Sequence, residues 1–98
     1  MNVNIEAIHF TAKADLDAFI KKGISKLDQY SDKITSADVQ LTVVKPEVSN
    51  NKEVMLKINI PNNELVVTKI ADTFEEAFDT AMDAMIKQIV KAKEKNRK

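Results

Sequence analysis

Three lysines near the C-terminus, Lys87, Lys91 and Lys95, are spaced four residues apart. On an α-helix this spacing places side chains on one face, in neighbouring turns. A row of ammonium groups of this kind fits the phosphates of a polyanion, which it binds by charge rather than by sequence. The spacing therefore predicts a cationic helix face as the candidate binding surface.

The charges along this C-terminal segment are sorted, which allows a second interpretation. Acidic residues come first and basic residues last, apart from Glu94. Acids are stabilised at the positive N-terminal end of a helix and bases at its negative end, but this effect fades within about one turn. The helix dipole therefore explains why acids precede bases, but it explains less well why there are so many cations. A charged face that is only solvated remains the alternative. The residues concerned are the acids Asp72, Glu75, Glu76, Asp79 and Asp83, and the bases Lys87, Lys91, Lys93, Lys95, Arg97 and Lys98.

No combination of residues indicates catalysis. His9 is the single histidine and the chain has no cysteine, so a zinc or thiol site lacks ligands. Asp79 and Asp83 share a helix face, but they fit the early acidic turns of a helix better than a catalytic pair. The serines lack a recognisable base, and the single glycine, Gly23, excludes a glycine-rich phosphate loop. We therefore expect no enzymatic activity, no cofactor, no metal ion and no small-molecule substrate.

The composition is typical of one globular domain. The 98 residues are 44% hydrophobic and 31% charged, and the net charge is zero. Nucleic acid must therefore be bound by local patches rather than by a global field. The apolar runs are shorter than a membrane span, and no secretory leader precedes the first predicted strand. We expect a single domain over residues 1–98, in the cytoplasm and without membrane contact.

Apolar residues alternate in four segments, which we predict as strands. These segments are residues 2–8, 37–45, 52–60 and 65–70. Residues 45–51 are typical of a loop, and residues 61–63 of a turn in which asparagine tolerates left-handed geometry. The strands carry no aromatic platform for stacking bases, so we expect nucleic acid to be bound through its backbone and shape, by the helices.

A first helix is predicted from about residue 13 to residue 30. Its apolar stripe runs from Leu16 to Leu27, and Thr11 is the expected N-cap. Gly23 lies within this stripe. It marks either close packing or a tolerated defect that costs about 1 kcal/mol relative to alanine.

A second helix is predicted from residue 73 to residue 98. Thr73 is its expected N-cap and Glu76 the partner in a capping box. Three phenylalanines on the apolar faces of the two helices are expected in the core: Phe19, Phe74 and Phe78.

The element order predicts a two-layer β-α-β-β-β-α domain of the α+β class. Each strand has one apolar face and each helix one apolar stripe, so a four-stranded sheet with both helices on one face is the economical packing. The strand–helix–strand start favours a right-handed crossover and a parallel first pair of strands. The short later connections predict antiparallel pairing.

Two stretches resemble a known family. Residues 27–34, Leu-Asp-Gln-Tyr-Ser-Asp-Lys-Ile, are similar to the KLxxYFDRI segment of the ribosome hibernation-promoting factor family, also called sigma-54 modulation protein or ribosome-associated inhibitor. Residues 77–79, Met85 and residues 87–89, with the lysines that follow, resemble the last helix of that family. The element order and the length match as well, so the resemblance covers essentially the whole chain.

The resemblance implies a bacterial ribosome-binding translation inhibitor with a fold similar to double-stranded RNA-binding domains. Such a protein occupies the mRNA and tRNA channel of the small ribosomal subunit during stationary phase or stress, and it blocks translation by occupancy. Its partners are the small subunit and its rRNA. The chain looks like the short form of the family, without the C-terminal domain of the long form, and we expect a monomer away from the ribosome.

Residue by residue, the resemblance carries rRNA binding over to basic positions of both helices. These positions are Lys26 in the first helix and Lys87, Lys91, Lys93 and Lys95 in the second, with Gln88 as a polar neighbour. We add Lys22, one turn before Lys26, to this set as a further phosphate contact.

Four positions depart from the family pattern. Gly23 and Ala84 stand where lysine is frequent, Asp17 where arginine is common, and Ser31 where phenylalanine is usual. The first three departures leave fewer cations to face rRNA, which Lys21, Lys22 and Lys33 could compensate.

A protein-interaction module is the alternative function. In that case the outer face of the sheet is the contact surface and the lysines only solvate the helices. A contiguous exposed apolar patch would favour this alternative. Its residues would be Ile8, Val44, Met55 and Val66.

Overall fold

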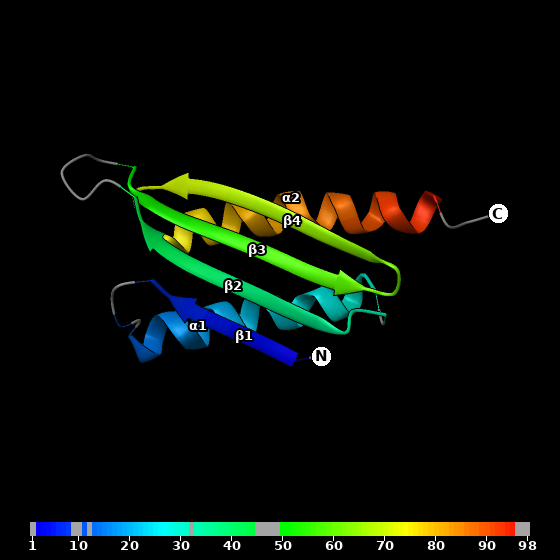
Figure 1. Cartoon of the computed structure of the whole chain (residues 1–98), viewed down its shortest axis with the longest axis horizontal. Coiled ribbons are helices and arrows are strands. Elements are labelled where there is room, and N and C mark those ends of the chain that lie inside the picture. The colour runs from blue at the N-terminus through cyan, green and yellow to red at the C-terminus, as the bar shows by residue number, and fades with distance from the viewer. Residues whose placement is uncertain (1, 9–10, 12, 32, 45–49, 96–98) are drawn as a thin grey trace.

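A computed structural model describes residues 2–8, 11, 13–31, 33–44 and 50–95, with side chains up to residue 92. The predicted β-α-β-β-β-α order and two-layer class are confirmed (Figure 1). The elements are β1 (Asn2–Ala7), α1 (Ala14–Ser25), the short 3₁₀ helix η1 (Lys26–Gln29), β2 (Ser36–Val43), β3 (Lys52–Ile60), β4 (Asn63–Ala71) and α2 (Phe74–Lys95).

The four strands form one sheet in the order β1-β2-β3-β4. β1 is parallel to β2, and the other two pairs are antiparallel, as the sequence predicts. Both helices cover the same face of this sheet, and they run in the same direction (Figure 1). The parallel direction follows because each helix runs back along a strand, and β1 and β4 point the same way in the sheet.

The core lies between the sheet and the helices. Alternate residues of β2 and β3, such as Leu41 and Leu56, are fully buried because strand side chains alternate between faces. The helices contribute Ile24 from α1 and Phe78 and Met85 from α2, all at most 1% exposed. The two periodicities in the sequence therefore meet in one apolar layer.

The predicted cap of the first helix is wrong. Thr11 is exposed and precedes the helix, which begins after Lys13, and no side chain caps this end. The first helix also ends earlier than predicted, at Ser25. The Ser25 hydroxyl donates a 2.6 Å hydrogen bond to the carbonyl oxygen of Lys22, and the chain then tightens into η1. Tightening of this kind is common at helix C-termini.

The predicted cap of the second helix is confirmed. The backbone N–H of Glu76 donates a 3.1 Å hydrogen bond to Oγ1 of Thr73. Asn62 has a φ of 64°, so the predicted left-handed turn is confirmed as well. β4 (Asn63–Ala71) extends beyond the predicted strand, residues 65–70, at both ends. His9 and residues 45–49 of the predicted loop lie outside the described residues.

The prediction that all three phenylalanines lie in the core is wrong for one of them. Phe74 and Phe78 are buried, whereas Phe19 is 37% exposed. Phe19 lies on the side of α1 that faces α2, where its ring meets the Phe78 ring edge-on at 5.9 Å between centroids. The helical stripe placed Phe19 on the apolar side, but the two helices leave space there rather than closing over it.

Candidate nucleic-acid interface

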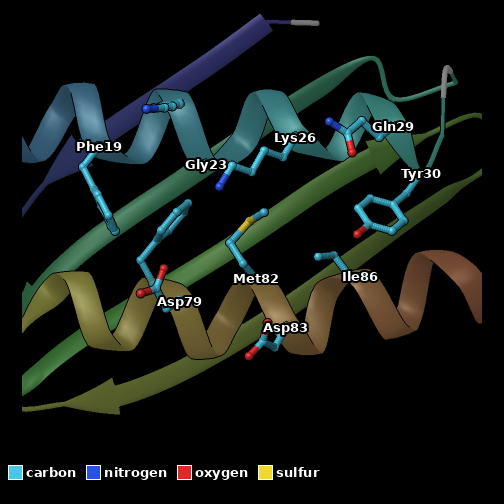
Figure 2. Close-up of a pocket in the computed structure, with 11 residues that line it drawn as sticks. Phe19, Gly23, Lys26, Gln29, Tyr30, Asp79, Met82, Asp83 and Ile86 are labelled. Carbon is cyan, nitrogen blue, oxygen red and sulfur yellow. The ribbon is translucent and has the colours of Figure 1, made fainter.

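Lys22 and Lys26 line a groove between the two helices. Lys22 belongs to the last turn of α1 and Lys26 begins η1, and both side chains are exposed. The groove has a volume of about 560 Å³ and opens on the helix layer, away from the sheet (Figure 2). The structure thus brings these two predicted site residues together on one wall.

The opposite wall of the groove is acidic. It is formed by α2, which contributes the exposed Asp79 and Asp83 (Figure 2). Phe78 and Met82, both buried, form the apolar floor together with the half-buried Ile86. A cationic wall therefore faces an anionic one over an apolar floor, an arrangement that the linear sequence does not reveal.

Lys87 and Lys91 are exposed on α2, but they do not line this groove. Each step of four residues along a helix turns the side chain by about 40°. The row Asp79, Asp83, Lys87 and Lys91 therefore drifts away from α1 as its charge changes sign. The predicted site accordingly has two separate cationic parts, one on α1–η1 and one on α2 outside the groove.

The remaining predicted site residues lie on the same helix. Gln88 is half-buried, so only part of its side chain is accessible. Lys93 and Lys95 belong to α2, and their side chains lie outside the described residues.

Each helix begins with acidic residues, and α1 and α2 run in the same direction (Figure 1), so their acidic ends lie at the same end of the helix layer. The acidic first turns, with Asp15 and Glu75 among them, lie at one end of the helix layer. Lys26 and Lys91 lie toward the other end. Although the net charge of the chain is zero, its helix layer has an acidic end and a basic end, and the basic end is available to an anionic partner.

Gly23 marks close packing, which decides between its two interpretations. A Cβ atom at this position would lie 2.5 Å from Cε2 and 3.0 Å from Cζ of Phe78. Distances this short require the buried Phe78 ring to move. A lysine or any other side chain at residue 23 would therefore conflict with the aromatic ring of Phe78 on α2.

The other positions that the resemblance marks as departures differ in their surroundings. Asp17 forms a 2.9 Å ion pair with Lys21 on the surface of α1, so Lys21 is engaged there and does not line the groove. Ser31 is buried, and its hydroxyl oxygen accepts a 3.2 Å hydrogen bond from the backbone N–H of Lys33. Ala84 is half-buried, and Lys33 is exposed after η1.

The outer face of the sheet is mostly polar. Side-chain amides bridge neighbouring strands: Asn4 donates to Asp38 at 3.0 Å, and Gln40 donates to Glu6 at 3.2 Å. The apolar residues of the predicted patch are interspersed among such groups. Val66 pairs in register with Lys57, and Met55 lies between Gln40 and Thr68. This mixed surface contrasts with the contiguous apolar patch that an interaction module would favour.

Neither a metal site nor a membrane span is found in the part of the chain that the structure describes. No group of three or more acidic, histidine or cysteine residues there is placed to hold a metal ion. None of the described helices is long and apolar enough to cross a membrane.

Comparisons with known proteins agree with this architecture. A family model described as "Sigma 54 modulation protein / S30EA ribosomal protein" matches residues 3–97. The chain is 27% identical over 95 residues to ribosome hibernation promoting factors of Azotobacter vinelandii and Pseudomonas putida. These alignments cover 97% of this chain and 85% and 89% of the two relatives.

Two solved structures share the fold. The N-terminal domain of Thermus thermophilus Protein Y superposes with a TM-score of 0.78 at 18% identity, covering 93% of this chain and 98% of that domain. A ribosomal subunit interface protein from Coxiella burnetii gives a TM-score of 0.83 at 16% identity, covering 95% of this chain and 98% of that protein. At these identities the likeness establishes the fold.

Proposed function

This chain belongs to the family of sigma 54 modulation proteins and S30EA ribosomal proteins, and we propose that it binds the small ribosomal subunit and inhibits translation by occupying the mRNA and tRNA channel. The observation that carries the proposal is the family match over residues 3–97. The hibernation promoting factors named above, similar along nearly their whole length, support the same activity. Ribosome binding implies a place in the cytoplasm, and stationary phase or stress is the expected setting.

The exposed lysines of the helix layer are the proposed rRNA contacts. Each ammonium group that neutralises a phosphate releases counterions, so it adds about 0.7 to 0.9 to the salt slope of binding. Contacts to phosphates position a protein without reading sequence. The proposed set is Lys22, Lys26, Lys87, Lys91, Lys93 and Lys95, with Gln88 as a polar neighbour.

The two cationic parts suggest how rRNA is engaged. Asp79 and Asp83 face Lys22 and Lys26 across the groove, whereas Lys87 and Lys91 continue the row of Asp79 and Asp83 further along α2. Phosphates repelled by these carboxylates would be contacted separately, at Lys22 and Lys26 and at Lys87 and Lys91, rather than along the groove. The protein would then bridge two rRNA backbone segments as a monomer, a mode that suits a structured channel better than a single flexible strand.

Cosedimentation with purified ribosomal subunits tests this proposal. We expect the protein to pellet with the small subunit at low and moderate salt, and to be displaced by tRNA or mRNA. Pelleting with both subunits alike, and only at low salt, would instead indicate generic polycation binding and would overturn the channel assignment.

A pair of matched variants separates the charged-face mechanism from net charge. Lys87→Glu with Lys91→Glu should abolish pelleting while leaving the circular dichroism melt nearly unchanged, since both side chains are exposed. Lys13→Glu with Lys57→Glu changes net charge equally at positions outside the proposed set and should still pellet. Equal binding by both variants would remove the lysine face from the mechanism.

A further inference from the structure

The groove between α1–η1 and α2 carries opposite charges on its two walls, and we propose that a second copy of this chain docks there to form a symmetric, reversible dimer. Lys22 and Lys26 form one wall, and Asp79 and Asp83 form the other. All four side chains are exposed. Among the described residues, no ion pair joins the two walls across the groove, so each wall is open to an outside partner.

The groove suits a second copy better than a polyanion. A phosphate chain lying along it would meet Asp79 and Asp83 at the same time as Lys22 and Lys26, and like charges brought together oppose binding. A second copy presents both signs. Above the buried Phe78 and Met82, the half-buried Ile86 and the 37% exposed Phe19 at the rim add apolar surface that another protein can cover.

The spacing of the charges allows both walls to be satisfied in one register. Lys22 and Lys26 are four residues apart, as are Asp79 and Asp83, and both helices run in the same direction. Lys26 lies across the groove at the level of Asp83 (Figure 2). A register that pairs Lys26 with Asp83 of another copy therefore also pairs Lys22 with Asp79.

A two-fold axis along the groove meets this requirement. It places α1 of one copy over α2 of the second copy, pointing the same way, and repeats the arrangement on the other side of the axis. Lys22 and Lys26 of each copy then face Asp79 and Asp83 of the other, so the interface uses the same patch twice. Isologous contacts of this kind close as dimers and do not grow into filaments.

We expect the dimer to be weak because exposed ion pairs hold it together. Exposed ion pairs contribute little individually, so we expect a dissociation constant on the order of 100 µM. In dilute solution the chain stays the monomer that the sequence predicts. The dimer covers Lys22 and Lys26, so self-association and rRNA contact through these lysines exclude each other, although the dimer itself does not depend on ribosome binding.

Sedimentation velocity on the full chain tests the dimer. Between about 10 µM and about 1 mM, a range that brackets weak association, the average mass should rise from 11.0 kDa toward twice that value. Lys22→Glu with Lys26→Glu makes both walls acidic, and Asp79→Lys with Asp83→Lys makes both basic. Each variant alone should remain monomeric, and an equimolar mixture of the two should recover association at least about tenfold over either alone.

Two controls isolate the groove from other causes. Lys13→Glu with Lys33→Glu carries the same net charge as the acidic-wall variant but keeps wild-type walls, so its mixture with the basic-wall variant should associate more weakly. Val66→Glu, on the outer sheet face, should leave the wild-type dimer intact. Circular dichroism verifies that every variant is folded.

Several results would overturn the proposal: a monomer throughout the concentration range, equal association in both mixtures, or loss of the dimer on Val66→Glu.

Changes in amide NMR chemical shifts identify which molecule occupies the groove. Shifts of Gly23 and Asp83 on dilution indicate the second copy, whereas shifts only on adding an rRNA hairpin would assign the groove to RNA. Small-subunit binding by the wild type, measured separately, stands or falls independently of the dimer.

Discussion

Gly23 of α1 and Phe78 of α2 are in direct apposition: a Cβ atom on Gly23 would lie 2.5 Å from Cε2 of the ring. Phe78 is 1% exposed and also contacts Phe19 edge-on, so the ring has little freedom to yield. The absence of a side chain at residue 23 thus sets how closely the two helices approach above the core.

Gly23→Ala should destabilise the fold despite the better helix propensity of alanine. Overpacking costs about 1 to 3 kcal/mol, and the propensity gain offsets about 1 kcal/mol of that. In a Phe78→Leu background, where the ring is gone, the same change should be neutral or stabilising. Urea unfolding of the four proteins in this cycle measures the coupling, and equal effects in both backgrounds would show that the contact is unimportant.

Gly23→Lys should not simply add the lysine that the resemblance leads us to expect at this position. The added Cβ meets the same ring, so we expect a loss of stability together with the gained charge. Lys22→Arg, a neighbouring change without the steric conflict, provides the comparison in urea unfolding and subunit binding. A stable Gly23→Lys variant with tighter binding would contradict the packing explanation.

Lys91→Gln should lower the salt dependence of small-subunit binding. Removal of one phosphate contact reduces the slope of log affinity against log salt by about 0.7 to 0.9. Lys13→Gln removes an exposed lysine outside the proposed set and should leave the slope unchanged. Binding isotherms at several salt concentrations give both slopes, and identical slopes would exclude Lys91 as a phosphate contact.

Thr73→Ala should destabilise the fold by about 1 kcal/mol, the usual cost of losing an N-cap side chain. Thr73 Oγ1 accepts the hydrogen bond from the N–H of Glu76, whereas Thr11 lies before the first helix and does not cap it. Thr11→Ala should therefore change the free energy of unfolding by less than about 0.5 kcal/mol. A larger effect at Thr11 than at Thr73 in chemical denaturation would reverse the two assignments.

Asp17→Asn should cost little stability. It breaks the 2.9 Å pair with Lys21, but both side chains are substantially exposed, and such helix pairs contribute only about 0.3 to 0.5 kcal/mol. High salt should screen most of this difference. Thermal melts at low and high salt test it, and a loss that persists at high salt would point to a role beyond the ion pair.

The secondary-structure elements and most of the core can be predicted from the order of the residues alone. Alternation in β3 predicted its bounds, because the side chains of a strand point to two different faces. The apolar stripe of α2 predicted the burial of Phe74 and Phe78, and Thr73 marked the start of that helix correctly. The lysine row on α2 is likewise a matter of helical spacing. Each of these features depends on contacts or periodicities within a few residues.

The way in which the two helices face each other depends on the packing of the whole fold. Their parallel direction and separation place Asp79 and Asp83 opposite Lys22 and Lys26, and leave Phe19 at the rim of a groove. The contact of Gly23 with Phe78 joins residues far apart in the chain. Such relations depend on the rotation of one helix against another, which packing on a common sheet sets and no local pattern encodes.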